Sequence, residues 1–99
     1  MEIKIQAIHF DATEQLRTFI EKKVTKLEKT FEDIQKVDVQ LKVVKPATAM
    51  NKEASLTVGV PGQKLFVEKV CDTFEESVDQ CVDSLKVQLT KFKEKRSNR

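Results

Sequence analysis

Residues 36–45 (KVDVQLKVVK) place the strongest constraint on the fold, because apolar and polar side chains alternate along them. The apolar positions of this pattern are Val37, Val39, Leu41 and Val43. A period of two predicts a strand with one buried face, so the chain must form a sheet that is covered on one side only. Pro46 follows and ends the strand, since proline cannot donate to the sheet ladder.

Three other segments have strand-like patterns. Residues 2–8 (EIKIQAI) and 54–60 (ASLTVGV) alternate clearly, whereas residues 63–71 (QKLFVEKVC) leave two faces in competition. The competing faces carry Leu65, Val67 and Cys71 on one side, and Phe66 and Val70 on the other. Between strands, Pro61-Gly62 predicts a tight turn, and residues 46–53 predict an exposed loop with Met50 near its tip.

Two segments instead have the threes-and-fours spacing of an amphipathic helix. The first is capped by Asp11 or Thr13 and ends at about Thr30 or Phe31, and the second covers residues 72–96. The first apolar stripe consists of Leu16, Phe19, Ile20, Val24, Leu27 and Phe31. The second consists of Phe74, Val78, Cys81, Val82, Leu85, Leu89 and Phe92.

The order of elements is therefore β-α-β-β-β-α, which predicts an α+β fold. The helical crossover makes the first two strands parallel, and the short links make the other pairs antiparallel. We expect a two-layer sandwich, with a four-stranded mixed sheet and two helices on its apolar face. The open face would carry Lys4, Gln6, Gln40, Lys42 and Thr57. Residues 1–96 form one predicted domain, and residues 97–99 a disordered tail.

The charges of the second helix are sorted along its length. Residues 72–83 contain five acids and no base, whereas residues 84–99 contain six bases and one acid. Acids at the start and bases at the end complement the helix dipole, which is one explanation. The other is a basic surface for an anionic partner, most plausibly RNA, although the formal net charge is only +2.

The first helix sorts its charges around the cylinder. At about 100° per residue, Glu14, Glu21 and Glu28 share one flank, and Lys22, Lys26 and Lys29 share the opposite one, with Lys23 between that flank and the stripe. An ordinary solvated helix gains from mixed Glu–Lys pairs. The separation of signs favours a partner for the basic flank, with an ordinary solvated face as the alternative.

The parts needed for catalysis or for a bound cofactor are missing. His9 is the only histidine and sits at a strand end, and with Cys71 and Cys81 it makes too few ligands for zinc. The sequence contains no glycine-rich phosphate loop. We therefore expect a binding protein with no enzymatic activity, no metal, no cofactor and no small-molecule substrate. The two cysteines, ten residues apart, indicate reduced thiols of a cytoplasmic protein, and no segment indicates a membrane span or a signal peptide.

Three stretches together resemble a known family over nearly the whole chain. The first stretch is Thr13-Glu14, Leu16-Arg17, Lys23, Lys26-Leu27-Glu28-Lys29 and Phe31. The second is Asp72, Phe74 and Val78-Asp79, and the third is Leu85, Gln88-Leu89-Thr90-Lys91, Lys93 and Lys95. These stretches are similar to the two helices of the ribosome hibernation promoting factors, the family that includes the ribosome-associated inhibitor called protein Y. The chain looks most like a short member without the further dimerising domain of long members.

The resemblance implies a ribosome hibernation factor. Such a protein would bind the small ribosomal subunit in the channel for mRNA and tRNA, contact 16S rRNA, and inhibit translation by occlusion. The contacts that the resemblance carries over are Lys23, Lys26, Lys29, Lys91, Lys93 and Lys95. The local charge pattern adds Lys22, Lys86 and Arg96. We expect a monomer in solution that does not pair ribosomes by itself.

The sequence also departs from the family pattern. Ser84 and Val87 stand where the family has lysine and arginine, and Glu75 and Glu76 stand where it has small residues. These acids would repel phosphate if they faced it, and Val87 is predicted to be exposed. The departures keep an alternative open, a protein-interaction module of the same fold that has lost ribosome binding.

Overall fold

The computed structural model describes residues 1–44 and 51–97, and their side chains as far as Lys95. The elements are β1 (Glu2–Ala7), α1 (Glu14–Thr25), α2 (Leu27–Thr30), β2 (Lys36–Val43), β3 (Lys52–Val60), β4 (Gln63–Cys71) and α3 (Phe74–Ser97). This is the predicted α+β order, with the first helix divided in two.

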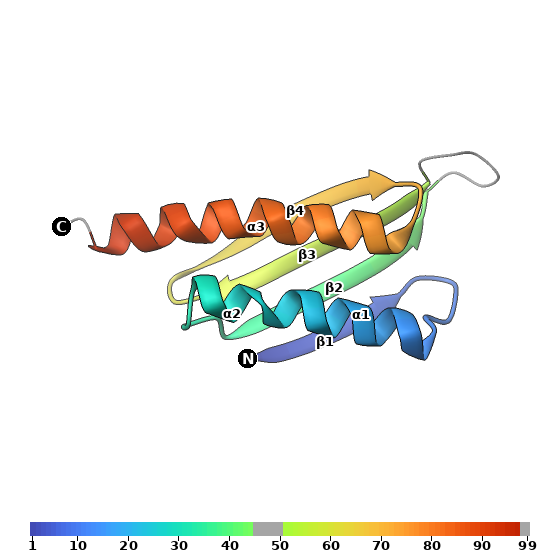
Figure 1. Cartoon of the computed structure of the whole chain (residues 1–99), viewed down its shortest axis with the longest axis horizontal. Coiled ribbons are helices and arrows are strands. Elements are labelled where there is room, and N and C mark those ends of the chain that lie inside the picture. The colour runs from blue at the N-terminus through green and yellow to red at the C-terminus, as the bar shows by residue number, and fades with distance from the viewer. Residues whose placement is uncertain (45–50, 98–99) are drawn as a thin grey trace.

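The sheet has the strand order β1-β2-β3-β4, with β1 parallel to β2 and the other pairs antiparallel. Figure 1 shows α1 and α3 side by side on one face of it, running in the same direction. The predicted mixed sheet and two-layer arrangement are therefore confirmed. The last turn of α3 continues past the end of the sheet (Figure 1), and its side chains from Lys93 to Lys95 are exposed.

A single apolar core lies between the two layers. On the sheet side it is built mainly from Val37, Val39, Leu41, Leu56 and Val58. On the helix side the fully buried apolar residues are Ile20, Val24, Leu27, Val78, Cys81, Val82, Leu85 and Leu89. Burial of a side chain of this size stabilises the fold by about 1.5–3 kcal/mol. The apolar positions of the alternating strands and of the two helical stripes together form this core.

The competition between the two faces of β4 is resolved by its pairing with β3. The register runs without a bulge from Lys52↔Cys71 to Val60↔Gln63. This register places Val67 and Cys71 in the buried layer, with Leu65 partly buried beside them, and leaves the Phe66 side chain 58% exposed on the open face. Gly62 has a φ of 86°, the conformation that the predicted Pro-Gly turn requires.

Two strand limits differ from the prediction. The second strand ends at Val43, whose side chain is 42% exposed although the alternation predicted it to be buried. The third strand begins at Lys52, inside the segment predicted as a loop, because Lys52 pairs with both Val43 and Cys71. The hydroxyl of Ser77 also donates to the Lys52 carbonyl at 2.6 Å. Pro46 and Met50 lie outside the described residues.

The predicted first helix is interrupted at Lys26. The Thr25 hydroxyl donates to the Glu21 carbonyl at 2.6 Å, an interaction that bends helices because it competes with the backbone ladder. The amide of Lys26 then bonds the Lys23 carbonyl, one residue closer than in an α-helix. The short α2 that follows buries Leu27 and leads to Phe31, whose ring meets that of Phe92 edge-on at 5.3 Å.

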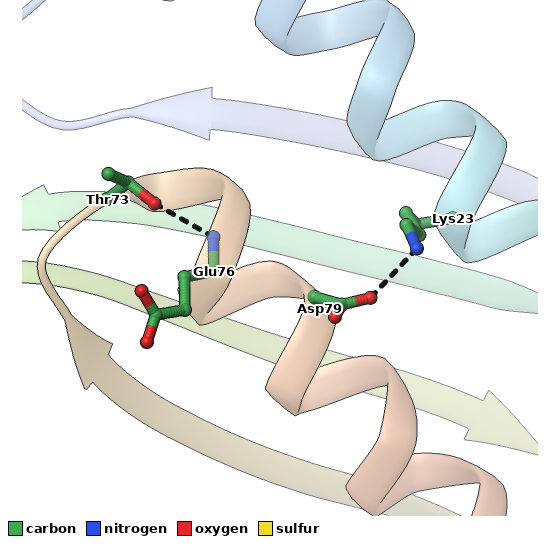
Figure 2. A network of polar contacts seen from close by, with 4 residues as sticks. All are labelled: Lys23, Thr73, Glu76 and Asp79. Atoms are coloured by element: carbon green, nitrogen blue, oxygen red, sulfur yellow. Dashed lines mark hydrogen bonds and ion pairs between the residues drawn. The ribbon is translucent and has the colours of Figure 1, made fainter.

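Threonine hydroxyls cap the starts of both long helices. Of the two candidate caps for α1, Thr13 is the one used, and its hydroxyl accepts from the Leu16 amide at 3.1 Å. Thr73 accepts from the Glu76 amide at 3.1 Å at the start of α3 (Figure 2). Each cap satisfies a backbone donor that the helix itself leaves unpaired.

Two neighbouring positions on α3 test the assignment of its buried face. Leu85→Ala should lower the free energy of unfolding by about 2–5 kcal/mol, because Leu85 is fully buried and truncation leaves a cavity. Val87→Ala is the matched control, since Val87 is 55% exposed, and should change stability by less than about 0.5 kcal/mol. Urea unfolding followed by circular dichroism measures both, and similar losses would show that the buried face of α3 is assigned wrongly.

Candidate nucleic-acid interface

The predicted contact residues all belong to the helical layer. Six are exposed lysines: Lys22, Lys26, Lys29, Lys91, Lys93 and Lys95. Lys23 and Lys86 are partly buried, and the side chain of Arg96 lies outside the described part of the chain. The candidate surface, called the basic face below, is thus carried by the outer sides of α1, α2 and α3.

On α1, the predicted basic flank surrounds an aromatic ring. A shallow hollow of about 610 Å³ is lined by Phe19, Lys22, Lys23 and Lys26 together with Thr18, Glu21 and Thr25. Phe19 is partly buried against the core. The structure therefore brings Lys22 and Lys26 together with Lys23 around one edge of an aromatic side chain, a combination suited to an anionic ligand with flat apolar surfaces.

Lys23 differs from its neighbours because its charge is already paired. Its Nζ lies 2.9 Å from Oδ1 of Asp79 on α3, as Figure 2 shows, with side chains 30% and 47% exposed respectively. The same ammonium lies 5.6 Å from the centre of the Phe19 ring. Sequence reasoning gave Lys23 the same role as Lys26 and did not identify Asp79 as its partner.

The lysines of α3 divide into two lines. Side chains seven residues apart lie within about 20° of each other on a helix, so Lys86 and Lys93 follow Asp79 along the side that meets α1. Lys91 and Lys95 lie on the other side of the helix. Lys86 and Lys93 therefore extend the basic flank of α1, whereas Lys91 and Lys95 form a second edge.

Dipole complementation explains only part of this charge pattern. The effect is confined to the first and last turns of a helix, which in α3 hold Glu75, Glu76, Glu94, Lys95 and Arg96. Asp79, Asp83 and Lys86 lie in the interior of the helix. The charge pattern of α3, acidic near its start and basic along its second half, therefore extends beyond the two turns where the dipole acts.

The groups considered for catalysis lie in different surroundings. His9 is exposed and has a φ of 64°, while Cys71 and Cys81 are buried free thiols. Burial raises the pKa of the Cys81 thiol to about 12, an effect that nearby Lys69 partly opposes. Within residues 1–44 and 51–97, no three histidine, cysteine, aspartate or glutamate side chains are placed to hold a metal ion. In the same part of the chain, no helix is long and apolar enough to span a membrane.

Comparisons with known proteins agree on one family. The family model described as Sigma 54 modulation protein / S30EA ribosomal protein matches residues 3–97. The ribosome hibernation promoting factor of Escherichia coli K12 is 33% identical over 95 residues, which cover 96% of each chain. That of Pseudomonas putida is 28% identical over 98 residues, covering 99% of this chain and 92% of the relative.

Solved structures show the same fold. The N-terminal domain of Thermus thermophilus protein Y superposes with a TM-score of 0.79 at 26% identity, covering 93% of this chain and 99% of that domain. A ribosomal subunit interface protein from Coxiella burnetii gives a TM-score of 0.83 at 22% identity, covering 94% and 98% of the two chains. The second likeness concerns the fold alone.

The buried thiol of Cys81 should be almost inert. A pKa raised from 9.0 to about 12 lowers the reactive thiolate fraction about a thousandfold at pH 8, because only the thiolate attacks. In the Cys71→Ala variant, the native protein should therefore react with Ellman's reagent at least about a thousandfold more slowly than the same variant unfolded in urea. A native rate within tenfold of the unfolded rate would contradict the burial of this thiol.

Proposed function

The chain belongs to the Sigma 54 modulation protein / S30EA ribosomal protein family, and from this membership we propose that it is a ribosome hibernation factor. In this proposal the protein binds the small ribosomal subunit and holds 16S rRNA phosphates with the lysines of its helical layer. It then inhibits translation by occupying the channel of mRNA and tRNA. The mechanism requires no catalysis and no cofactor, and the protein acts in the cytoplasm as a monomer.

The observation that carries this proposal is the clustering of lysines on one part of the helical layer. The helical layer presents six exposed lysines in two groups, within residues 22–29 and 91–95. Apart from Glu94, the exposed acids of its described helices lie outside these groups, at Glu14, Glu21, Glu75, Glu76 and Asp83. The open face of the sheet carries equal numbers of both signs, with Lys4, Lys36, Lys42 and Lys64 against Glu2, Asp38, Glu53 and Glu68. Lysines clustered on one part of a surface, beside a face of mixed charge, are the distribution expected of a protein that binds a polyanion on that part.

The exposed Val87 supports a second candidate function, that of a protein-interaction module. At the position where the family has arginine, α3 presents an apolar side chain that is 55% exposed. Glu75 and Glu76 are exposed as well. A protein-interaction module of the same fold would use this side of α3 for an apolar contact and would not need the ribosome.

Salt dependence separates these two functions. If about six lysine–phosphate contacts form, the log–log slope of affinity against salt should be roughly −4 to −5, because each contact releases a condensed counterion. Co-sedimentation with purified small ribosomal subunits at salt concentrations from about 0.05 M to about 0.3 M measures this slope, because counterion release changes the affinity strongly over that range. Competition by tRNA or mRNA tests the occlusion step. Absence of pelleting at the lowest salt would reject ribosome binding and favour the interaction module.

Neutralising four lysines should distinguish the two faces. Changing Lys26, Lys29, Lys91 and Lys95 together to Gln should weaken binding by about a thousandfold at 0.1 M salt, since each contact contributes about five- to eightfold there. The matched control changes Lys4, Lys36, Lys42 and Lys64 to Gln, which removes the same charge from the open face. Its affinity should fall by less than about tenfold, because charges farther than a Debye length are screened. Equal losses would show that net charge, and not the basic face, determines binding.

A further inference from the structure

We propose that Asp79 is a specificity-determining residue that withholds Lys23 from RNA and so marks the limit of the basic face. The inference rests on the proposed function, because it concerns the same interface. It assigns Lys23 to the contact between α1 and α3 and restricts phosphate binding to the part of the helical layer beyond Asp79.

The first argument is the environment of the Lys23 ammonium. It is held 2.9 Å from a carboxylate and lies 5.6 Å from the centre of an aromatic ring, so two groups of this chain already stabilise its charge. A phosphate that approached Lys23 would have to displace Asp79 or share the ammonium with it. Sharing brings two negative charges to within a few ångströms of each other, which is repulsive.

The second argument is the position of the pair along the layer. Before Lys86, the charged side chains of α3 are all acidic: Glu75, Glu76, Asp79 and Asp83. From Lys86 onwards the described charges are lysines, except for Glu94. Asp79 is the acid of this group that forms an ion pair with a residue of α1. The acidic part of α3 therefore also neutralises a lysine of the neighbouring helix.

The third argument is that the pair is not needed to hold the helices together. Both side chains reach solvent, and ion pairs in such positions contribute little to folding stability. Packing of the apolar stripes keeps α1 against α3, with Ile20, Val78 and Val82 fully buried between the layers. The carboxylate can therefore be removed from a folded protein, and its effect on RNA can be measured separately.

The test removes one charged side chain at a time and measures the affinity for small ribosomal subunits. In Asp79→Asn, Lys23 becomes available to a phosphate, so affinity for small ribosomal subunits should rise about five- to eightfold at 0.1 M salt, with a steeper salt slope by about 0.7–0.9. Asp83→Asn is the matched control: it removes the same charge one turn later, where no ion pair to a described lysine is present. Its affinity should rise less than about twofold.

Two single lysine variants and one double variant test whether Lys23 contacts RNA. Lys23→Gln in the otherwise unchanged chain should leave affinity within about twofold, whereas Lys26→Gln should lower it about five- to eightfold. In the double variant Asp79→Asn with Lys23→Gln, the gain from the first change should disappear. Urea unfolding checks that each variant is folded, and Asp79→Ser provides a second removal of the carboxylate if the asparagine variant is unfolded.

The outcomes also separate this inference from the proposed function. If the unchanged protein and Lys26→Gln behave as expected but Lys23→Gln loses as much affinity as Lys26→Gln, Lys23 contacts RNA and the inference is wrong. An equal gain from Asp79→Asn and Asp83→Asn would also overturn it, because only general charge would then matter. If the unchanged protein does not sediment with small subunits at low salt, the proposed function fails and the inference fails with it.

Discussion

Burial of one face of β2 and β3 under α1 and α3 is the interaction on which the rest of the structure depends. The buried side chains of both strands and both helices belong to one core, and the structure has no second apolar layer between its described elements. Because the sheet offers a single apolar face, both helices must share it, and they lie side by side. Their outer sides then form one continuous surface. Lysines separated by more than sixty residues in the sequence, such as Lys22 and Lys86, thereby belong to the same face of the molecule.

Local periodicity made most of the fold predictable from the sequence. A period of two in residues 36–45 and a period of 3.6 in residues 74–92 each specify a buried face without information from the rest of the chain. The features that escaped prediction depend on neighbours. The face of β4, for example, was settled by its register with β3. The break at Lys26, where the Lys26 amide bonds the Lys23 carbonyl, is not encoded in periodicity.

The candidate site was predictable to a similar degree and for similar reasons. The exposure of Lys26, Lys29 and Lys91 follows from their angle to the apolar stripe, which sequence alone provides. The pairing of Lys23 with Asp79 does not, because it depends on how far α1 and α3 are offset along their axes. The ion pair gives Asp79 a specific partner, which the helix dipole does not provide because Asp79 lies beyond the first turn of α3.

The end of α3 that continues past the sheet is much narrower than the rest of the molecule. The molecule measures 50 × 22 × 18 Å, but past Phe92 only a single helix of about 10–12 Å diameter remains. Five residues of helix, 93–97, extend this narrow part by about 7–8 Å at 1.5 Å per residue. A crevice too narrow for two layers still admits one helix. Lys93 and Lys95 can therefore reach surfaces from which the lysines of α1 are sterically excluded.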